Sequence, residues 1–270
     1  MQRAFSCQHS VTHLLRRTIA CAVFFCLLGA RTATPETTLA KDKLSFKPIL
    51  CESDANTKRE TADCLQRFKE LATRDGDELR LNMEGGKTKV YTDINGGCDP
   101  FKCAAFHLTA FYPSLQSFLV QKIVPECADN ELVSRRSGSI LHLAATVPEL
   151  SPDGKYFVSI DQDELCERAY DLAIWSTSTD PPALELKRKA EAERYEYWTV
   201  LGWARDDRIK LKVWVHDLHK QPHESYDQDV EAVRSGKGWK LVWGKRVDRI
   251  LQKPSLPTRT PGPPAYLTPH

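Results

Sequence analysis

The sequence lacks the motifs and runs that mark several large protein classes. No apolar run reaches the roughly 18–20 residues that a membrane-spanning helix needs. No GxSxG, SxxK or HExxH motif indicates a catalytic nucleophile or a zinc peptidase. No two cysteines have the CxxC spacing of a thioredoxin-type centre or a zinc ribbon. We therefore assign no catalytic residue, and we expect no stable membrane span after removal of a signal segment.

An excess of charge of one sign is also missing. The 270 residues include 38 basic and 36 acidic side chains, a net charge of +2. Residues 1–34 contain four arginines and no acidic residue, so the remaining chain has 34 basic and 36 acidic residues. A nearly neutral chain has no basic face for phosphate backbones, so nucleic acid is not an expected partner.

The first 34 residues are typical of an export signal. Arg3, Arg16 and Arg17 precede a twelve-residue apolar run, Ile19–Ala30. A basic segment followed by an apolar run of this length is the signal-peptide pattern, and a short amphipathic or buried helix is the alternative. We expect a periplasmic or secreted protein.

The rest of the chain divides into three parts by composition. A helix is predicted over 57–73, because Thr57 and Glu60 fit a capping box and apolar residues follow at helical spacing. The tail contains six prolines in eighteen residues, a composition typical of disorder. The predicted organisation is a signal peptide, a linker with a helix, an all-β domain and a disordered tail: 1–34, 35–78, 79–252 and 253–270.

The segment 79–252 has the pattern of short antiparallel strands. Residues 79–83 and 87–92 alternate in polarity around Glu84-Gly85-Gly86, which predicts a hairpin. Eleven further strand candidates, separated by turn residues, follow between residues 106 and 243. We therefore expect a mostly β fold.

Three segments of this region look alike: Tyr112–Leu119, Ser151–Val158 and Trp203–Lys210, each a turn followed by a strand. The first two begin 39 residues apart, and periods of about 40–50 residues are typical of propeller blades. The middle copy, Ser151-Pro152-Asp153-Gly154, resembles the SPDG turn of TolB-like and WD-type β-propeller repeat proteins. The other two copies lack Asp-Gly, and no Trp-Asp dipeptide closes a unit. The resemblance implies three to four antiparallel propeller-like meander units, and an irregular β-sandwich or barrel is the alternative.

Six cysteines remain after the signal segment, an even number that predicts up to three disulfides in an exported chain: Cys51, Cys64, Cys98, Cys103, Cys127 and Cys166. We expect the local pairs Cys51–Cys64 and Cys98–Cys103, with a crossed pairing between these four as the alternative. When Phe118 is aligned with Phe157, Cys127 falls on Cys166, so these two are expected to form the third bridge.

One loop collects possible metal ligands: His216, Asp217, His219 and His223. Imidazole and carboxylate groups at this spacing could hold zinc or copper. An exposed polar loop explains the same residues.

These observations favour an exported, disulfide-bonded β-repeat protein that serves as a binding or scaffold module for an unknown protein or small ligand. The main alternative is a metal-dependent hydrolase that uses His216, His219 and His223. A further alternative is a secreted inhibitor held rigid by its disulfides.

Overall fold

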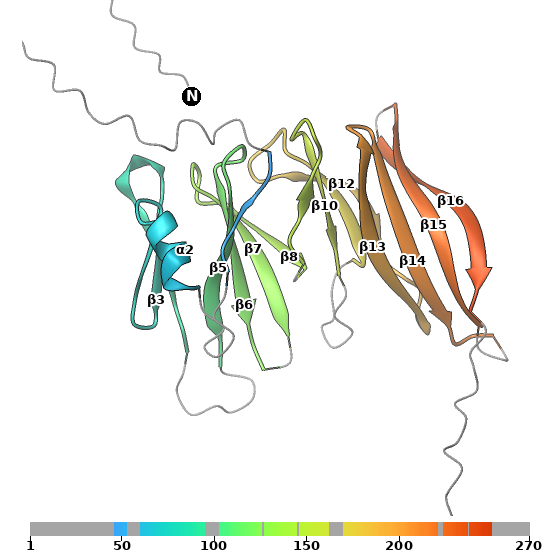
Figure 1. Ribbon diagram of the computed structural model, residues 1–270, viewed down its shortest axis with the longest axis horizontal. Coiled ribbons are helices and arrows are strands. Elements are labelled where there is room, and N and C mark those ends of the chain that lie inside the picture. Colours follow the sequence, from blue (N-terminus) through green and yellow to red (C-terminus); the bar gives the residue numbers. More distant parts are fainter. Residues whose placement is uncertain are drawn as a thin grey trace, which may run out of the picture. The chain divides into compact units, whose positions relative to one another are not determined.

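The computed structural model of the protein describes most of the chain between Phe46 and Arg249, namely residues 46–52, 60–94, 103–125, 127–144, 146–161, 170–220, 224–236 and 238–249. All of these belong to one unit by their contacts. They form four antiparallel sheets that follow one another in chain order (Figure 1). The predicted mostly β fold is therefore confirmed.

Each sheet is an up-and-down meander. The first consists of β2 (Ala72–Asp75), β3 (Glu78–Asn82) and β4 (Thr88–Thr92). The second consists of β5 (Ala105–Tyr112), β6 (Ser117–Ile123), β7 (Ala128–Ser134) and β8 (Ile140–Ala144), with β1 (Ile49–Leu50) on the outer edge of β5. The third consists of β9 (Glu149–Leu150), β10 (Tyr156–Ile160), β11 (Leu172–Ser176) and β12 (Ala183–Arg188). The fourth consists of β13 (Arg194–Arg205), β14 (Arg208–Asp217), β15 (Glu224–Ser235) and β16 (Gly238–Asp248).

The predicted hairpin over 79–92 is present as β3 and β4, joined by a short 3-10 turn, η1 (Glu84–Gly86). Every sheet is open, with two edge strands, so the described strands form no closed barrel. The propeller-like arrangement itself stays a prediction.

The three similar segments occupy equivalent places. Each lies at the connection between the first two consecutive strands of its meander: β5 to β6, β9 to β10, and β13 to β14. Phe118, Phe157 and Ile209 are each the second residue of the second of these strands, and all three are fully buried. The residues that aligned the segments are therefore core residues of successive sheets.

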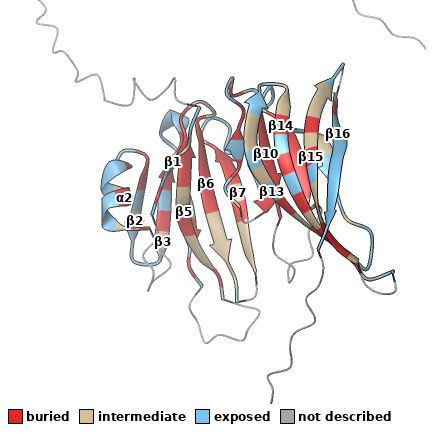
Figure 2. Ribbon diagram, turned by 45° about the vertical axis from the view of Figure 1, so that its right-hand side comes forward, coloured by how far each residue is buried: buried red, intermediate tan, exposed pale blue. Residues whose placement is uncertain are grey.

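The sheets pack face to face in series. One cluster of buried side chains joins the first sheet to the second, another joins the second to the third, and another joins the third to the fourth. In β10, Phe157 packs toward the second sheet while Tyr156 and Val158 pack toward the fourth, because successive side chains of a strand point to opposite faces. Figure 2 accordingly shows β10 buried and β16 exposed along most of its length.

The predicted helix over 57–73 is wrong in extent. The helix α2 covers only Ala62–Arg67, and its N-cap is Thr61, whose hydroxyl accepts a hydrogen bond from the amide of Cys64 at 3.3 Å. Thr57 lies outside the described residues. Downstream the chain turns into β2, where Ala72 pairs with Leu81. Strand pairing ends the helix, because so short a helix has little stability of its own.

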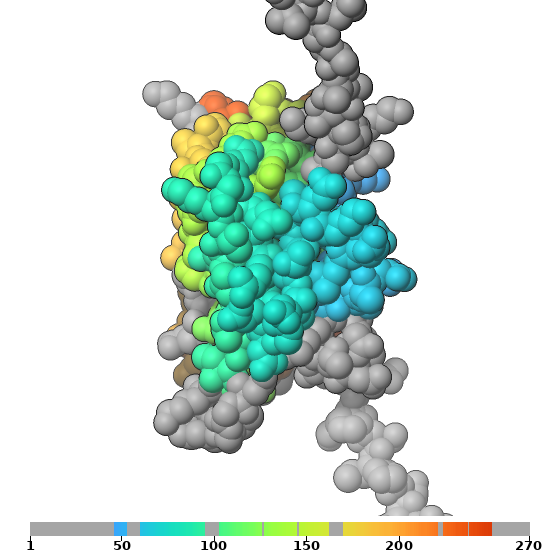
Figure 3. Space-filling model, turned by 90° about the vertical axis from the view of Figure 1, so that its left-hand side faces the viewer, coloured from blue at the N-terminus to red at the C-terminus, as the bar shows by residue number. Residues whose placement is uncertain are grey.

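The apolar residues that suggested a longer helix have another role. Phe68 and Leu71 lie beyond α2 and bury their side chains in the cluster between the first two sheets. Figure 3 shows the surface that α2 and the first sheet present on this side. The first sheet thus begins at β2, inside the segment that we predicted to be linker and helix.

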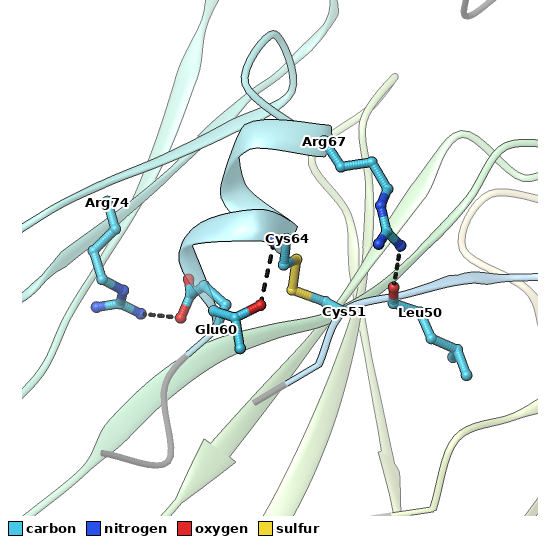
Figure 4. The surroundings of a disulfide bond; sticks show 7 residues. Leu50, Cys51, Glu60, Cys64, Arg67 and Arg74 are labelled. Atoms are coloured by element: carbon cyan, nitrogen blue, oxygen red, sulfur yellow. Dashed lines mark hydrogen bonds and ion pairs between the residues drawn. A yellow bond between two sulfur atoms is a disulfide. The ribbon is translucent and has the colours of Figure 1, made fainter. Parts of the chain in front are cut away.

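A disulfide ties α2 to the second sheet. Cys51 follows β1 and Cys64 lies in α2, with 5.3 Å between their Cα atoms (Figure 4). The expected Cys51–Cys64 pair is therefore present, and the crossed pairing is excluded. Cys103 and Cys127 are also disulfide-bonded. Cys98 and Cys166, the partners that we expect for them, lie outside the described residues.

Two predicted segments, the signal peptide 1–34 and the tail 253–270, also lie outside the described residues. In the part of the chain that is described, no helix is long and apolar enough to cross a membrane.

Candidate functional site

A pocket of about 240 Å³ lies where the turns of the second and third sheets meet. Alternate turns of an antiparallel meander emerge at the same end of its sheet. The β5–β6 and β7–β8 turns of the second sheet therefore reach the pocket together, as do the β9–β10 and β11–β12 turns of the third. Phe46, from the segment before β1, completes the lining.

Phe46 is held against the SPDG-like turn. Gly154 of this turn has φ +69°, a left-handed conformation that favours glycine. A Cβ atom at this position would overlap the ring of Phe46. Ser151 stabilises the same turn, since its hydroxyl accepts a hydrogen bond from the amide of Tyr156 at 3.0 Å. The turn residues that carry the resemblance therefore also shape one wall of the pocket.

Among the described residues that line the pocket, one carries a carboxylate: Asp180 in the β11–β12 turn. Its two oxygens accept hydrogen bonds from the hydroxyls of Ser134 and Ser139, each at 2.6 Å. The limited burial of Asp180 would by itself raise its pKa. The serine hydroxyls outweigh this effect and hold the pKa of Asp180 below its ordinary value. The carboxylate is therefore ionised at neutral pH.

Of the basic side chains in the described part of the chain, one lines the same pocket: Arg136 of the β7–β8 turn. The field of Arg136 also favours the ionised form of Asp180, so the two groups are near one another. Among the described residues, neither Arg136 nor Asp180 takes part in an ion pair. Asp153, in the neighbouring turn, differs in this respect because Lys155 lies 2.9 Å from its carboxylate. Two opposite charges thus line the pocket without neutralising each other.

The hydroxyl groups of the lining are mostly committed as donors. Ser117, Thr177 and Thr179 each donate to a backbone carbonyl, those of Leu115, Gly154 and Pro181. A hydroxyl that donates its hydrogen inside the protein keeps only acceptor capacity for a ligand. Ser114, by contrast, has a buried Oγ that forms no hydrogen bond with any described residue. The lining therefore offers several oxygen acceptors beside a negative charge.

The predicted metal ligands are not assembled into a metal centre by the described residues. His216 Nδ1 lies 2.6 Å from Ser225 Oγ, and Asp217 accepts a hydrogen bond from the amide of His219 at 3.0 Å. His219 Nε2 lies 2.7 Å from the carbonyl oxygen of Ala192. No three His, Cys, Asp or Glu side chains of the described part form a group suited to a metal ion. His223 lies outside that part, so the zinc or copper site stays a prediction.

A second polar cluster lies buried between the first two sheets. Arg74 of β2 is 3.1 Å from the carboxylate of Glu60 and 3.3 Å from that of Asp93 (Figure 4 shows the Glu60 contact). His107 of β5 is buried beside them, and burial lowers its pKa, with Glu60 acting in the opposite direction. Two carboxylates face one guanidinium, so Arg74 offsets part of their charge, and its hydrogen bond to the carbonyl of Phe106 links β2 to β5.

Neither the pocket nor the ion cluster was predicted from the sequence. The pocket's turns, 134–139 and 176–182, are rich in serine and threonine, which ordinary turns also favour. The one sequence feature that pointed to the pocket was that two such turns belong to neighbouring units.

No protein-family model, curated protein or solved structure matches the chain.

Proposed function

We propose that this chain is an exported, disulfide-bonded binding protein that holds a small polar ligand in the pocket between its second and third sheets. The observation that carries the proposal is the lining, in which Arg136 and Asp180 bring opposite charges to a wall of hydroxyl acceptors. Ligand sites commonly combine a concave surface with a few convergent polar groups of this kind.

Binding is favoured over catalysis by the chemistry of the lining. A serine or threonine nucleophile needs an adjacent base, and no histidine or lysine is found among the described lining residues. Asp180 is a poor general base because its lowered pKa and its serine hydrogen bonds both stabilise the carboxylate. This lining is therefore better suited to holding a ligand than to transforming it.

Export is supported by the cysteines. Cys51, Cys64, Cys103 and Cys127 are all disulfide-bonded, and disulfides persist mainly in oxidising compartments. The predicted signal segment agrees with this reading. Expression in a secreting host should yield a processed protein that begins after about residue 33 and has no reactive thiol. An unprocessed chain with free thiols would refute the proposed export.

The binding function is tested by chemical-shift mapping on the isotope-labelled, oxidised protein. Glucose, L-leucine and acetate are added separately at millimolar concentration. The proposal expects at least one of these probes to shift resonances of the turns at 114–117, 136 and 177–182, without being converted to a product. Shifts confined to the fourth sheet, or turnover of the probe, would contradict it.

A further inference from the structure

We propose that the pocket binds a small zwitterion of the size of a free α-amino acid, with the ligand ammonium at Asp180 and the ligand carboxylate at Arg136. This inference rests on the proposed function and specifies its ligand class. It follows from three features of the lining: the two separate charges, the direction of the hydroxyl hydrogen bonds, and the size of the pocket.

The two charges favour a ligand that carries complementary charges. Arg136 and Asp180 sense each other's field, but no ion pair joins them in the described structure. A cation alone would satisfy Asp180 and leave Arg136 without a counter-charge, and an anion alone would do the reverse. A zwitterion satisfies both and adds no net charge to the pocket, so the cost of removing it from water is offset at both ends.

The hydroxyl groups select which end of the ligand lies where. Ser117, Thr177 and Thr179 donate their hydrogens to backbone carbonyls and can only accept from a ligand. Each carboxylate oxygen of Asp180 accepts one serine hydroxyl and keeps a further lone pair. An ammonium group, with three donors and no acceptor, fits this set of oxygens.

The guanidinium of Arg136 completes the complementarity, because its planar donors match the two oxygens of a carboxylate. Its side chain is exposed, so it can adjust to the ligand.

The volume and the apolar part of the lining limit the size. About 240 Å³ is below the range of roughly 300–1,000 Å³ of pockets for drug-sized ligands. Phe46, Leu115 and Pro182 supply an apolar patch beside the charged groups. A short aliphatic side chain would cover this patch, so L-leucine is a suitable probe.

The experiment measures the affinity of the oxidised full-length mature protein for four probes by titration calorimetry. L-Leucine carries both charges, leucinamide only the ammonium, 4-methylpentanoate only the carboxylate, and glucose neither. L-Leucine is expected to bind at least about tenfold more tightly than each of the other three. Loss of one charged contact of this kind typically corresponds to about such a factor.

Two variants assign the charges. Asp180→Asn should weaken leucine and leucinamide binding about tenfold and leave 4-methylpentanoate unaffected. Arg136→Gln, at an exposed position that does not challenge folding, should weaken leucine and 4-methylpentanoate and leave leucinamide unaffected. Asp153→Asn is the matched control. Asp153 also accepts a serine hydroxyl, from Ser151 at 2.8 Å, but Lys155 already neutralises it.

The outcomes separate this inference from the proposed function. If glucose binds in the pocket as tightly as L-leucine, the zwitterion inference is wrong and the binding function stands. Equal weakening by Asp153→Asn and Asp180→Asn would also overturn the inference. If none of the four probes binds, both the inference and the proposed small-ligand function fail.

Discussion

Replacing Arg74 by methionine should destabilise the protein far more than the loss of an exposed arginine. The Arg74 side chain is 8% exposed, and the side chains of Glu60 and Asp93 are fully buried. Arg74 also donates a hydrogen bond to the carbonyl of Phe106, at the edge of the second sheet. Methionine has a similar length and an apolar surface, so the change removes the charge and the donors while largely preserving packing volume.

The expected cost comes from the carboxylates that stay behind. Removing one partner of a buried ion pair typically lowers the free energy of unfolding by about 3–5 kcal/mol, because a charge remains in the interior without compensation. Arg80, on the adjacent strand β3, is the matched control. It pairs with Glu78, and these side chains are 46% and 39% exposed. Arg80→Met should therefore cost no more than about 1 kcal/mol.

Urea unfolding at pH 7 under non-reducing conditions, followed by tryptophan fluorescence, measures both changes. Adding Glu60→Gln to Arg74→Met should restore part of the lost stability, since it removes one of the two buried charges. If Arg74→Met costs no more than Arg80→Met, the ion cluster does not hold the first two sheets together and the reasoning fails.

Three further predictions concern His107, the bridge of Cys127 and the turn glycine Gly154. Burial lowers the pKa of His107 below 6.5, so the unfolded chain binds more protons in the window just below pH 6.5. Stability should therefore fall as the pH is lowered through that window, and His107→Gln should reduce this slope in urea titrations. Non-reducing peptide mapping should recover a Cys127–Cys166 bridge, and a free thiol at either position would contradict the alignment of the two units. Gly154→Ala should lower the melting temperature more than Gly138→Ala, because both glycines have positive φ but only Gly154 lies against a ring. Equal losses of melting temperature in the two variants would show that backbone strain at positive φ, and not the contact with the ring, causes the effect.

Much of the sheet architecture could be predicted because it depends on local sequence patterns, namely alternating polarity and turn residues. Residues that alternate in polarity around a glycine turn predicted the hairpin over 79–92, and it is present as β3 and β4. The similar segments around Phe118, Phe157 and Ile209 did lie at equivalent turns of successive sheets. A period of two and a turn glycine act within a few residues, so they are visible without the fold.

The end of α2 shows where local patterns stop being sufficient. Phe68 and Leu71 continue the helical spacing, and a helix through residue 73 satisfied every local rule. The competing arrangement, in which Ala72 pairs with Leu81, buries the same side chains and adds strand hydrogen bonds. The helical spacing of apolar residues does not indicate pairing with a later strand. The pairing is favoured because a helix of this length has little stability by itself.

By itself, the sequence predicted that this protein is built from antiparallel strands, and it favoured the pair Cys51–Cys64 while leaving a crossed pairing open. Only the tertiary structure decided what lies between the sheets. Ser117 and Asp180 are more than sixty residues apart in the chain, and Glu60 and Asp93 more than thirty. The residues of each pair lie close together because one sheet face packs on the next. The buried side chains that form this packing do not by themselves specify which turns meet. A pocket or a buried ion pair is a property of that packing, so no local pattern could indicate it.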